Sequence, residues 1–200
     1  MKTLIIVDVQ NDFVPGGALA VPEGDTIISR INELQQKFEL VVATQDWHPA
    51  NHKSFASQHE GKHPFDIIDL NGLEQTLWPD HCIQGTKGSE LHKDLNTDRI
   101  EAIFRKGTNP EIDSYSGFFD NGNKKSTGLA GYLKELNATS IFVCGLAGDF
   151  CVYHTAVDAL NLGYPTTILE QSTKAINPAN FEQLKNEFME KGGEISSYIL

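Results

Sequence analysis

Short apolar runs recur along the chain and alternate with stretches in which apolar residues have helical spacing. A continuous apolar run is typical of a strand that is buried on both faces of a parallel sheet. The runs that predict strands are residues 3–9, 39–44, 100–104, 140–146, 164–170 and 195–200. We therefore expect six strands.

The stretches between these strands predict helices. They are residues 25–38, 126–136, 151–160 and 177–188. Asp25 and Asn177 stand where an N-cap side chain would accept from free backbone N–H groups, and Pro178 falls in a first turn. Strands alternating with helices predict an α/β fold, a three-layer α/β/α arrangement around a parallel six-stranded sheet.

Two stretches lack clear periodicity. Residues 49–97 are rich in polar side chains and predict one long loop, which in a compact domain is usually functional or disordered. This stretch contains Trp78, His81 and Cys82 close together, and the second irregular stretch, residues 108–125, contains Tyr115. We therefore look for function in both.

Length and charge narrow the class of protein. The 200 residues, with no linker between them, predict one domain covering residues 1–200. A formal net charge of −11 argues against binding to nucleic acid or to anionic membranes. There is no apolar stretch long enough for a membrane span or a signal peptide. Three cysteines, an odd number without framework spacing, predict reduced thiols and a cytoplasmic protein.

Four chemically reactive side chains follow the first four predicted strands: Asp8, Asp46, Lys106 and Cys151. In an open parallel sheet, ligands bind beyond the carboxyl ends of the strands, where the strand order reverses. Each residue also has an ordinary interpretation, since Asp8 could simply end a strand and Lys106 could be solvated. Their coincidence favours a catalytic set.

Cys151 stands where a predicted strand passes through a small-residue corner into a helix. Free N–H groups and the helix dipole favour a thiolate there, so we expect a lowered pKa and a catalytic nucleophile. The same N–H groups could bind the oxyanion of a tetrahedral intermediate. The alternative is a small residue buried at a strand–helix corner.

Asp46 and His48 are separated by one residue, a spacing that suits a divalent metal, and His81 could complete a set of three ligands. The remaining histidines are expected to be surface or core residues, with His154 packing along its helix. They are His52, His59, His63, His92 and His154.

Six motifs in this order carry a family resemblance: residues 8–13 (DVQNDF), 44–49 (TQDWHP), 78–82 (WPDHC), 105–107 (RKG), 115–118 (YSGF) and 145–152 (GLAGDFCV). The chain resembles the nicotinamidases of the isochorismatase-like cysteine hydrolases along almost its whole length. The resemblance implies that fold and the hydrolysis of nicotinamide to nicotinate and ammonia through a cysteine thioester, a step of NAD salvage. It further implies activity on pyrazinamide, a small-molecule substrate as the partner, and leaves a homo-oligomer open.

The resemblance also implies roles for individual residues. Asp8, Lys106 and Cys151 would form the catalytic triad. The amides of Ala147 and Cys151 would form the oxyanion hole, beside a cis peptide between Ala147 and Gly148. The implied substrate-binding residues are Phe13, Trp78 and Tyr115. The implied ligands of one divalent metal ion, zinc before iron or manganese, are Asp46, His48 and His81.

The chain departs from the family at two positions. Gly148 stands where threonine or serine is usual, and Ser54 stands where some relatives have a further histidine ligand. Two alternatives stay open: a metal-independent hydrolase of N-carbamoyl or ureido compounds from the same superfamily, and a non-catalytic binding protein on this fold. A thiol redox role is weaker, because Cys144 and Cys151 lie far from a Cys-x-x-Cys spacing.

Overall fold

The structure is a computed structural model, and it describes residues 1–197. Six parallel strands form the main sheet in the order β5-β2-β1-β6-β7-β8. The strands are β1 (Lys2–Val7), β2 (Leu40–Asp46), β5 (Ile100–Lys106), β6 (Ser140–Gly145), β7 (Thr166–Thr173) and β8 (Glu194–Ser196). All six predicted strands are confirmed, although residues 198–200 of the last one lie outside the described residues.

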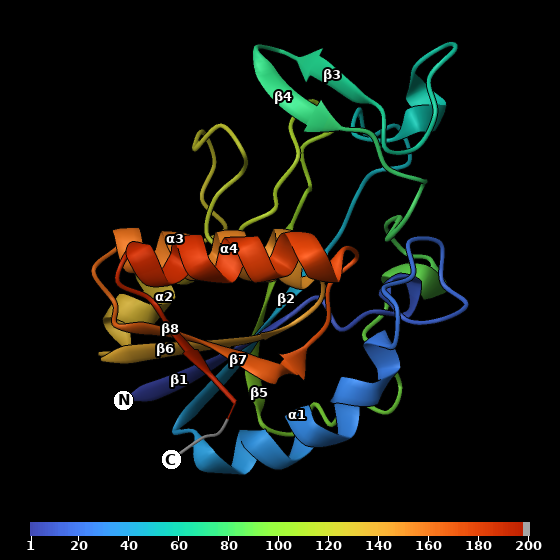
Figure 1. Cartoon of the computed structure of the whole chain (residues 1–200). Coiled ribbons are helices and arrows are strands. Elements are labelled where there is room, and N and C mark those ends of the chain that lie inside the picture. The colour runs from blue at the N-terminus through green and yellow to red at the C-terminus, as the bar shows by residue number, and fades with distance from the viewer. Residues whose placement is uncertain (198–200) are drawn as a thin grey trace.

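Helices cover both faces of the sheet, which confirms the three-layer prediction (Figure 1). One face packs against α1, whereas the other packs against α2, α3 and α4. The helices are α1 (Ile28–Leu34), α2 (Leu129–Glu135), α3 (Tyr153–Asn161) and α4 (Pro178–Glu190). Within residues 1–197, no helix combines the length and the apolar character that a membrane span needs.

The alternating faces of β1 explain how the two cores form. Leu4 and Ile6 belong to the core under α1, whereas Ile5 and Val7 belong to the core under the other helices, and all four are fully buried. Burying one such side chain contributes about 1.5–3 kcal/mol to stability. A segment buried on both faces favours apolar residues at successive positions, as Leu4–Val7 of β1 has.

Helix starts were predicted correctly at α4 and incorrectly at α1. The Asn177 side chain accepts from the backbone N–H of Asn180 at 3.1 Å, and Pro178 occupies the first turn, as expected. Asp25 caps no helix, because a 3-10 turn (Gly24–Ile27) precedes α1 and Ile27 is its N-cap. The α2 helix begins later than predicted, after Gly128, whose φ of +94° is left-handed.

The stretch predicted as one long loop contains an antiparallel hairpin, β3 (Ile67–Leu70) and β4 (Leu73–Thr76). The hairpin projects away from the main sheet (Figure 1). Its first two residues, Ile67 and Ile68, are both apolar, with Ile67 exposed and Ile68 partly buried, so the sequence gives no clear alternation. Gln75 of β4 is buried and reaches the region described next.

Candidate active site

The four reactive side chains meet at the point where the strand order reverses. Strands β1 and β6 are neighbours although they lie far apart in the chain, and this break in order forms the crevice where α/β proteins bind ligands. Asp8 directly follows β1, while Asp46 and Lys106 end the adjacent strands β2 and β5 in register. Cys151 lies in the turn after β6.

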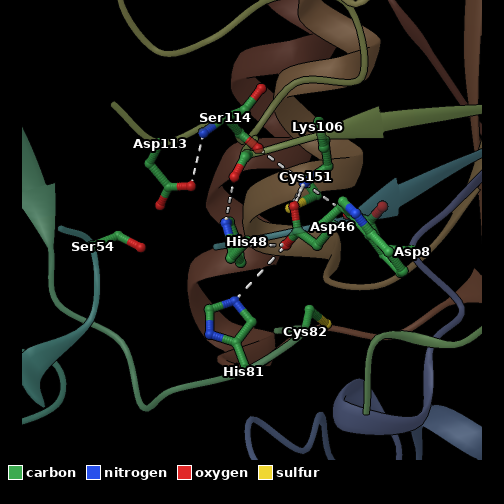
Figure 2. A network of polar contacts seen from close by, with 12 residues as sticks. Asp8, Asp46, His48, Ser54, His81, Cys82, Lys106, Asp113, Ser114 and Cys151 are labelled. Carbon is green, nitrogen blue, oxygen red and sulfur yellow. Dashed lines mark hydrogen bonds and ion pairs between the residues drawn. The ribbon is translucent and has the colours of Figure 1, made fainter. Parts of the chain in front are cut away.

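Lys106 is the centre of this cluster (Figure 2). Its ammonium Nζ lies 2.6 Å from Asp46 Oδ1, 2.9 Å from Asp8 Oδ2 and 3.3 Å from Cys151 Sγ. It also donates to the Ser114 carbonyl at 2.9 Å. The Lys106 and Asp8 side chains are completely buried. The structure thus brings together the three residues predicted as a triad, although their roles stay a prediction.

Burial and charge set the protonation of the acidic groups. Burial raises the pKa of Asp8, and the attraction of Lys106 offsets this only in part. Asp46 is also buried, but Lys106 and His48 hold its pKa well below the ordinary value. Lys106 itself has a raised pKa, because Asp46 and Asp8 outweigh the effect of its burial. Asp8 is therefore the carboxylate of the pair that takes up a proton more readily.

The expected lowering of the Cys151 pKa is wrong for this structure. Burial raises the pKa of the thiol well above its ordinary value, and the nearby Lys106 offsets only part of that rise. Cys151 lies inside a π-helical turn (Gly148–Val152), and the N–H groups of Phe150 and Val152 donate to the Ala147 carbonyl. These donors are directed to the backbone rather than to the sulfur, so burial dominates.

The turn that carries Cys151 is packed closely against its neighbours. Gly145 has a φ of +118°, and a Cβ there would lie 2.1 Å from the Val7 carbonyl oxygen. The carboxylate of Asp149 accepts from the N–H groups of Ile176 and Asn177 at 2.9 and 2.8 Å. The sequence of small residues predicts a sharp corner, and its fixed position comes from these contacts.

The cis peptide bond lies one position earlier than expected. It joins Leu146 and Ala147 rather than Ala147 and Gly148. A run of small residues indicates where the corner lies and leaves the individual bond undetermined. A Cβ on Gly148 would lie 3.0 Å from side-chain atoms of Phe181 and Thr173, which explains why a small residue fits here.

The predicted metal ligands also meet (Figure 2). Asp46 Oδ2 lies 3.5 Å from His48 Nε2 and 3.8 Å from His81 Nε2. Nδ1 of His48 lies 2.9 Å from the Gly107 carbonyl oxygen and Nδ1 of His81 lies 2.7 Å from the Pro79 carbonyl oxygen. Each carbonyl accepts a hydrogen bond from the ring Nδ1–H, which leaves Nε2 unprotonated as a ligand atom, as is usual for metal-bound histidine. One carboxylate and two imidazoles fit a divalent metal ion.

His52 is a core histidine beside this ligand set. Its side chain is fully buried, its ring centroid lies 4.4 Å from that of His48, and Nδ1 lies 2.7 Å from Ser54 Oγ. Burial lowers the pKa of His52 to about 4. His154 packs its ring against Tyr115 and Tyr153, as expected of a histidine that packs along its helix.

A pocket opens onto the cluster. Its walls are Phe13, Leu19, Asp46, Trp78, His81, Asp113, Tyr115, Ala147, Phe150, Cys151 and Ile176. The three predicted substrate-binding residues, Phe13, Trp78 and Tyr115, are among them. Trp78 meets Phe150 edge-to-face at 4.8 Å between ring centroids. The pocket is thus aromatic, with the thiol and two metal-type ligands in its walls.

Sequence reasoning missed four residues of this wall: Leu19, Asp113, Phe150 and Ile176. Phe150 could have been found from its place next to Cys151. The other three carry no local signal, because they lie in irregular segments that reach the pocket only through the fold.

Comparisons with known proteins agree with this geometry. The isochorismatase domain matches residues 2–198. The nicotinamidase of Escherichia coli is 49% identical over 180 residues, covering 88% of this chain and 84% of that protein. Among solved structures, an Acinetobacter baumanii nicotinamidase and pyrazinamidase has a TM-score of 0.94 and 48% identity, covering 97% of this chain and 94% of that one.

A pyrazinamidase of Pyrococcus horikoshii in complex with zinc has a TM-score of 0.81 and 38% identity, covering 98% of this chain and 99% of that one. These matches extend over nearly all of the chain, and the cluster and the pocket lie within the matched region. The chain therefore belongs to the isochorismatase family and, within it, groups with the nicotinamidases.

Proposed function

We propose that this protein is a nicotinamidase, an amidohydrolase that converts nicotinamide and water to nicotinate and ammonia. The observation that carries the proposal is the 3.3 Å approach of Cys151 Sγ to Lys106 Nζ, which also binds Asp8, in a pocket with aromatic walls. The Escherichia coli and Acinetobacter baumanii relatives support nicotinamide as the substrate.

The first half of the reaction acylates Cys151. Asp8 accepts the thiol proton, and Lys106 stabilises the thiolate as it forms. The raised pKa of Asp8 favours this transfer, since the proton moves to a carboxylate that holds it well. The thiolate attacks the amide carbon, and the amides of Ala147 and Cys151 bind the oxyanion. The C–N bond then breaks, Asp8 returns the proton to the leaving nitrogen, and ammonia and a thioester result.

The second half releases the acid. Asp8 takes a proton from a water molecule, whose oxygen attacks the thioester carbon. The C–S bond breaks and the proton held by Asp8 returns to the Cys151 sulfur. Nicotinic acid leaves and ionises to nicotinate, which releases the second proton of the water. Asp8 accepts and then donates a proton in each half, so one carboxylate beside one ammonium is sufficient for all the proton transfers of the reaction.

The pyridine ring would lie between Phe13 and Trp78, with Tyr115 beside it. Asp46, His48 and His81 would hold a divalent metal ion, which supplies a Lewis acid for the ring nitrogen and thereby orients the ring. The zinc-bound Pyrococcus horikoshii relative supports zinc, before iron or manganese. Lys106 contacts the other oxygen of Asp46, so this carboxylate links the ligand set to the triad.

Ammonia release from nicotinamide tests the proposal. Cys151→Ala should lower turnover by about 10³-fold or more and keep its metal, because the sulfur is the nucleophile. Cys144→Ala is the matched control, since Cys144 is also a buried free thiol but lies within β6. Turnover near the wild-type rate in Cys151→Ala would rule out the thioester route.

Metal removal separates this activity from hydrolysis of N-carbamoyl or ureido compounds. We expect a chelator, or His48→Ala, to raise the KM for nicotinamide or abolish its binding, and added zinc to restore the chelated protein. A protein that releases ammonia only from N-carbamoyl compounds, with or without metal, would contradict the proposal. Ammonia release from pyrazinamide tests whether the enzyme also hydrolyses this second aromatic amide.

A further inference from the structure

Asp113 is a carboxylate in the pocket wall that has no role in the reaction described above. It lies in the segment after β5, is 3% exposed, and lines the pocket together with Cys151 and Tyr115. Figure 2 shows it on one side of His48, with Asp46 and Asp8 on the other. A buried acid in a largely aromatic wall is costly unless it is well bound, so its partners matter.

Both oxygens of Asp113 are held. Oδ1 accepts from the Ser114 N–H at 2.7 Å, and Oδ2 accepts from Gln75 Nε2 at 3.1 Å. The Asp113 carbonyl accepts from the Asn121 N–H at 2.8 Å, and the next carbonyl, that of Ser114, binds the Lys106 ammonium. The carboxylate is therefore held in this orientation by one hydrogen bond to each oxygen.

The neighbouring groups respond to this negative charge. Burial, followed by the charge of Asp113, raises the pKa of the Tyr115 phenol. Asp46 and Asp113 line the pocket, and Asp8 joins this group through the ammonium that it shares with Asp46. Lys106 offsets one of these three carboxylates. A divalent ion at the predicted ligand set would offset the other two carboxylates. With Asp113 the net charge of these groups is zero, and without it the net charge would be positive.

We propose that Asp113 is a specificity-determining residue that makes the pocket prefer a neutral aromatic amide to the carboxylate formed from it. The inference rests on the proposed function, in which an uncharged substrate becomes an anion between the same walls. A fixed negative charge in a buried wall repels the anion and leaves the neutral amide unaffected, so product leaves more readily.

Product inhibition measures this preference. The experiment compares the Ki of nicotinate with the KM of nicotinamide in wild type and in Asp113→Asn, with zinc content determined on the same samples. We expect Asp113→Asn to lower the ratio of Ki to KM about tenfold, because it removes the charge and keeps the shape. Asp113→Glu keeps the charge and should stay within about twofold of the wild-type ratio.

Gln75→Met is the matched control, because it removes a hydrogen bond to Asp113 and leaves the charge. It should also keep the wild-type ratio. An unchanged ratio in Asp113→Asn, an equal fall in Gln75→Met, or a fall that follows loss of zinc would each overturn the role of Asp113. Asp113→Ser replaces Asp113→Asn if the latter does not fold. A wild type that releases no ammonia overturns the proposed function, whereas an active wild type with unchanged ratios overturns this inference alone.

Discussion

Two lysines in this protein are buried and each lies between two acids, and the two clusters differ mainly in how far those acids are exposed. Lys106 contacts Asp8 and Asp46 at the carboxyl ends of the central strands. Lys185, on α4, contacts Glu182 on the same helix at 2.7 Å and Glu170 on β7. The residue types are nearly the same, so a list of charges would not distinguish the two clusters.

Solvent exposure distinguishes them. The side chains of the first cluster are at most 5% exposed, whereas Glu170 and Glu182 are 36% and 69% exposed. Burial raises the pKa of Asp8, while the hydrogen bond from Lys185 lowers that of Glu170. A carboxylate beside lysine becomes a proton acceptor suited to catalysis only when water is excluded from it.

Removing the two lysines should give the largest contrast. Lys106→Met leaves two buried carboxylates without a counter-ion and should cost about 3–5 kcal/mol of unfolding free energy and nearly all activity. Lys185→Met should cost about 1 kcal/mol or less and leave activity unchanged, because its acids are solvated. Urea unfolding and ammonia release measure both. Equal losses of stability in the two variants would remove the distinction.

Acid should affect the buried region first, through His52. Its pKa is lowered from 6.5 to about 4, so the unfolded chain binds more protons between these values and stability falls as pH decreases through them. In metal-free protein we expect a loss of about 3 kcal/mol across this window, absent in His52→Gln. The control is His63→Gln, whose side chain is 83% exposed. Parallel stability curves for wild type and His52→Gln would contradict the prediction.

Gly107→Ala tests whether the buried ligands need their fixed orientation. A Cβ on Gly107 would lie 2.2 Å from His48 Cε1, so the ring must shift away from the carbonyl that orients it. We expect zinc affinity to fall about 10–100-fold in a zinc titration. Gly128→Ala is the matched control, because its φ of +94° imposes similar backbone strain and a Cβ there meets no atom within 4 Å. Equal zinc affinities in Gly107→Ala and Gly128→Ala would contradict the need for a fixed orientation of His48.

The smallest effect should come from the exposed cluster in acid. The folded pKa of Glu170 is lowered, so its contribution is present above pH 4.5 and is lost as pH falls through the lowered value. Glu170→Gln should therefore cost about 0.5 kcal/mol at neutral pH and nothing in strong acid. Urea unfolding at both pH values measures it. A loss of several kcal/mol of unfolding free energy in Glu170→Gln would show that this cluster contributes to stability as much as the buried one, against the prediction.

The sequence predicts the sheet well and the hairpin poorly, for one physical reason. Most of β1 and β6 is buried between two layers, so most of their successive positions are apolar and the run is visible without knowledge of the fold. The β3–β4 hairpin is only partly buried, with Ile67 61% accessible, and its apolar residues do not alternate regularly with polar ones, so no strand period is visible.

Burial in regular strands also separates the site residues that the sequence predicts from those that it does not. Asp8, Asp46 and Lys106 follow apolar strands, so their convergence at one edge of the sheet follows from the strand pattern. Asp113 and Ile176 lie in irregular segments and enter the pocket through Gln75, Asn121 and Asp149, contacts that no local pattern records.

By itself, the sequence determined the α/β layers, the family and the residue types gathered at the strand ends, because burial imposes periodicity and parallel strands share an edge. Only the tertiary structure decided that Cys151 is buried enough to raise its pKa, that Asp8 and Asp46 have opposite shifts, and that Asp113 lines the pocket. These properties depend on distances between side chains and on the exclusion of water, which exist once the chain is folded.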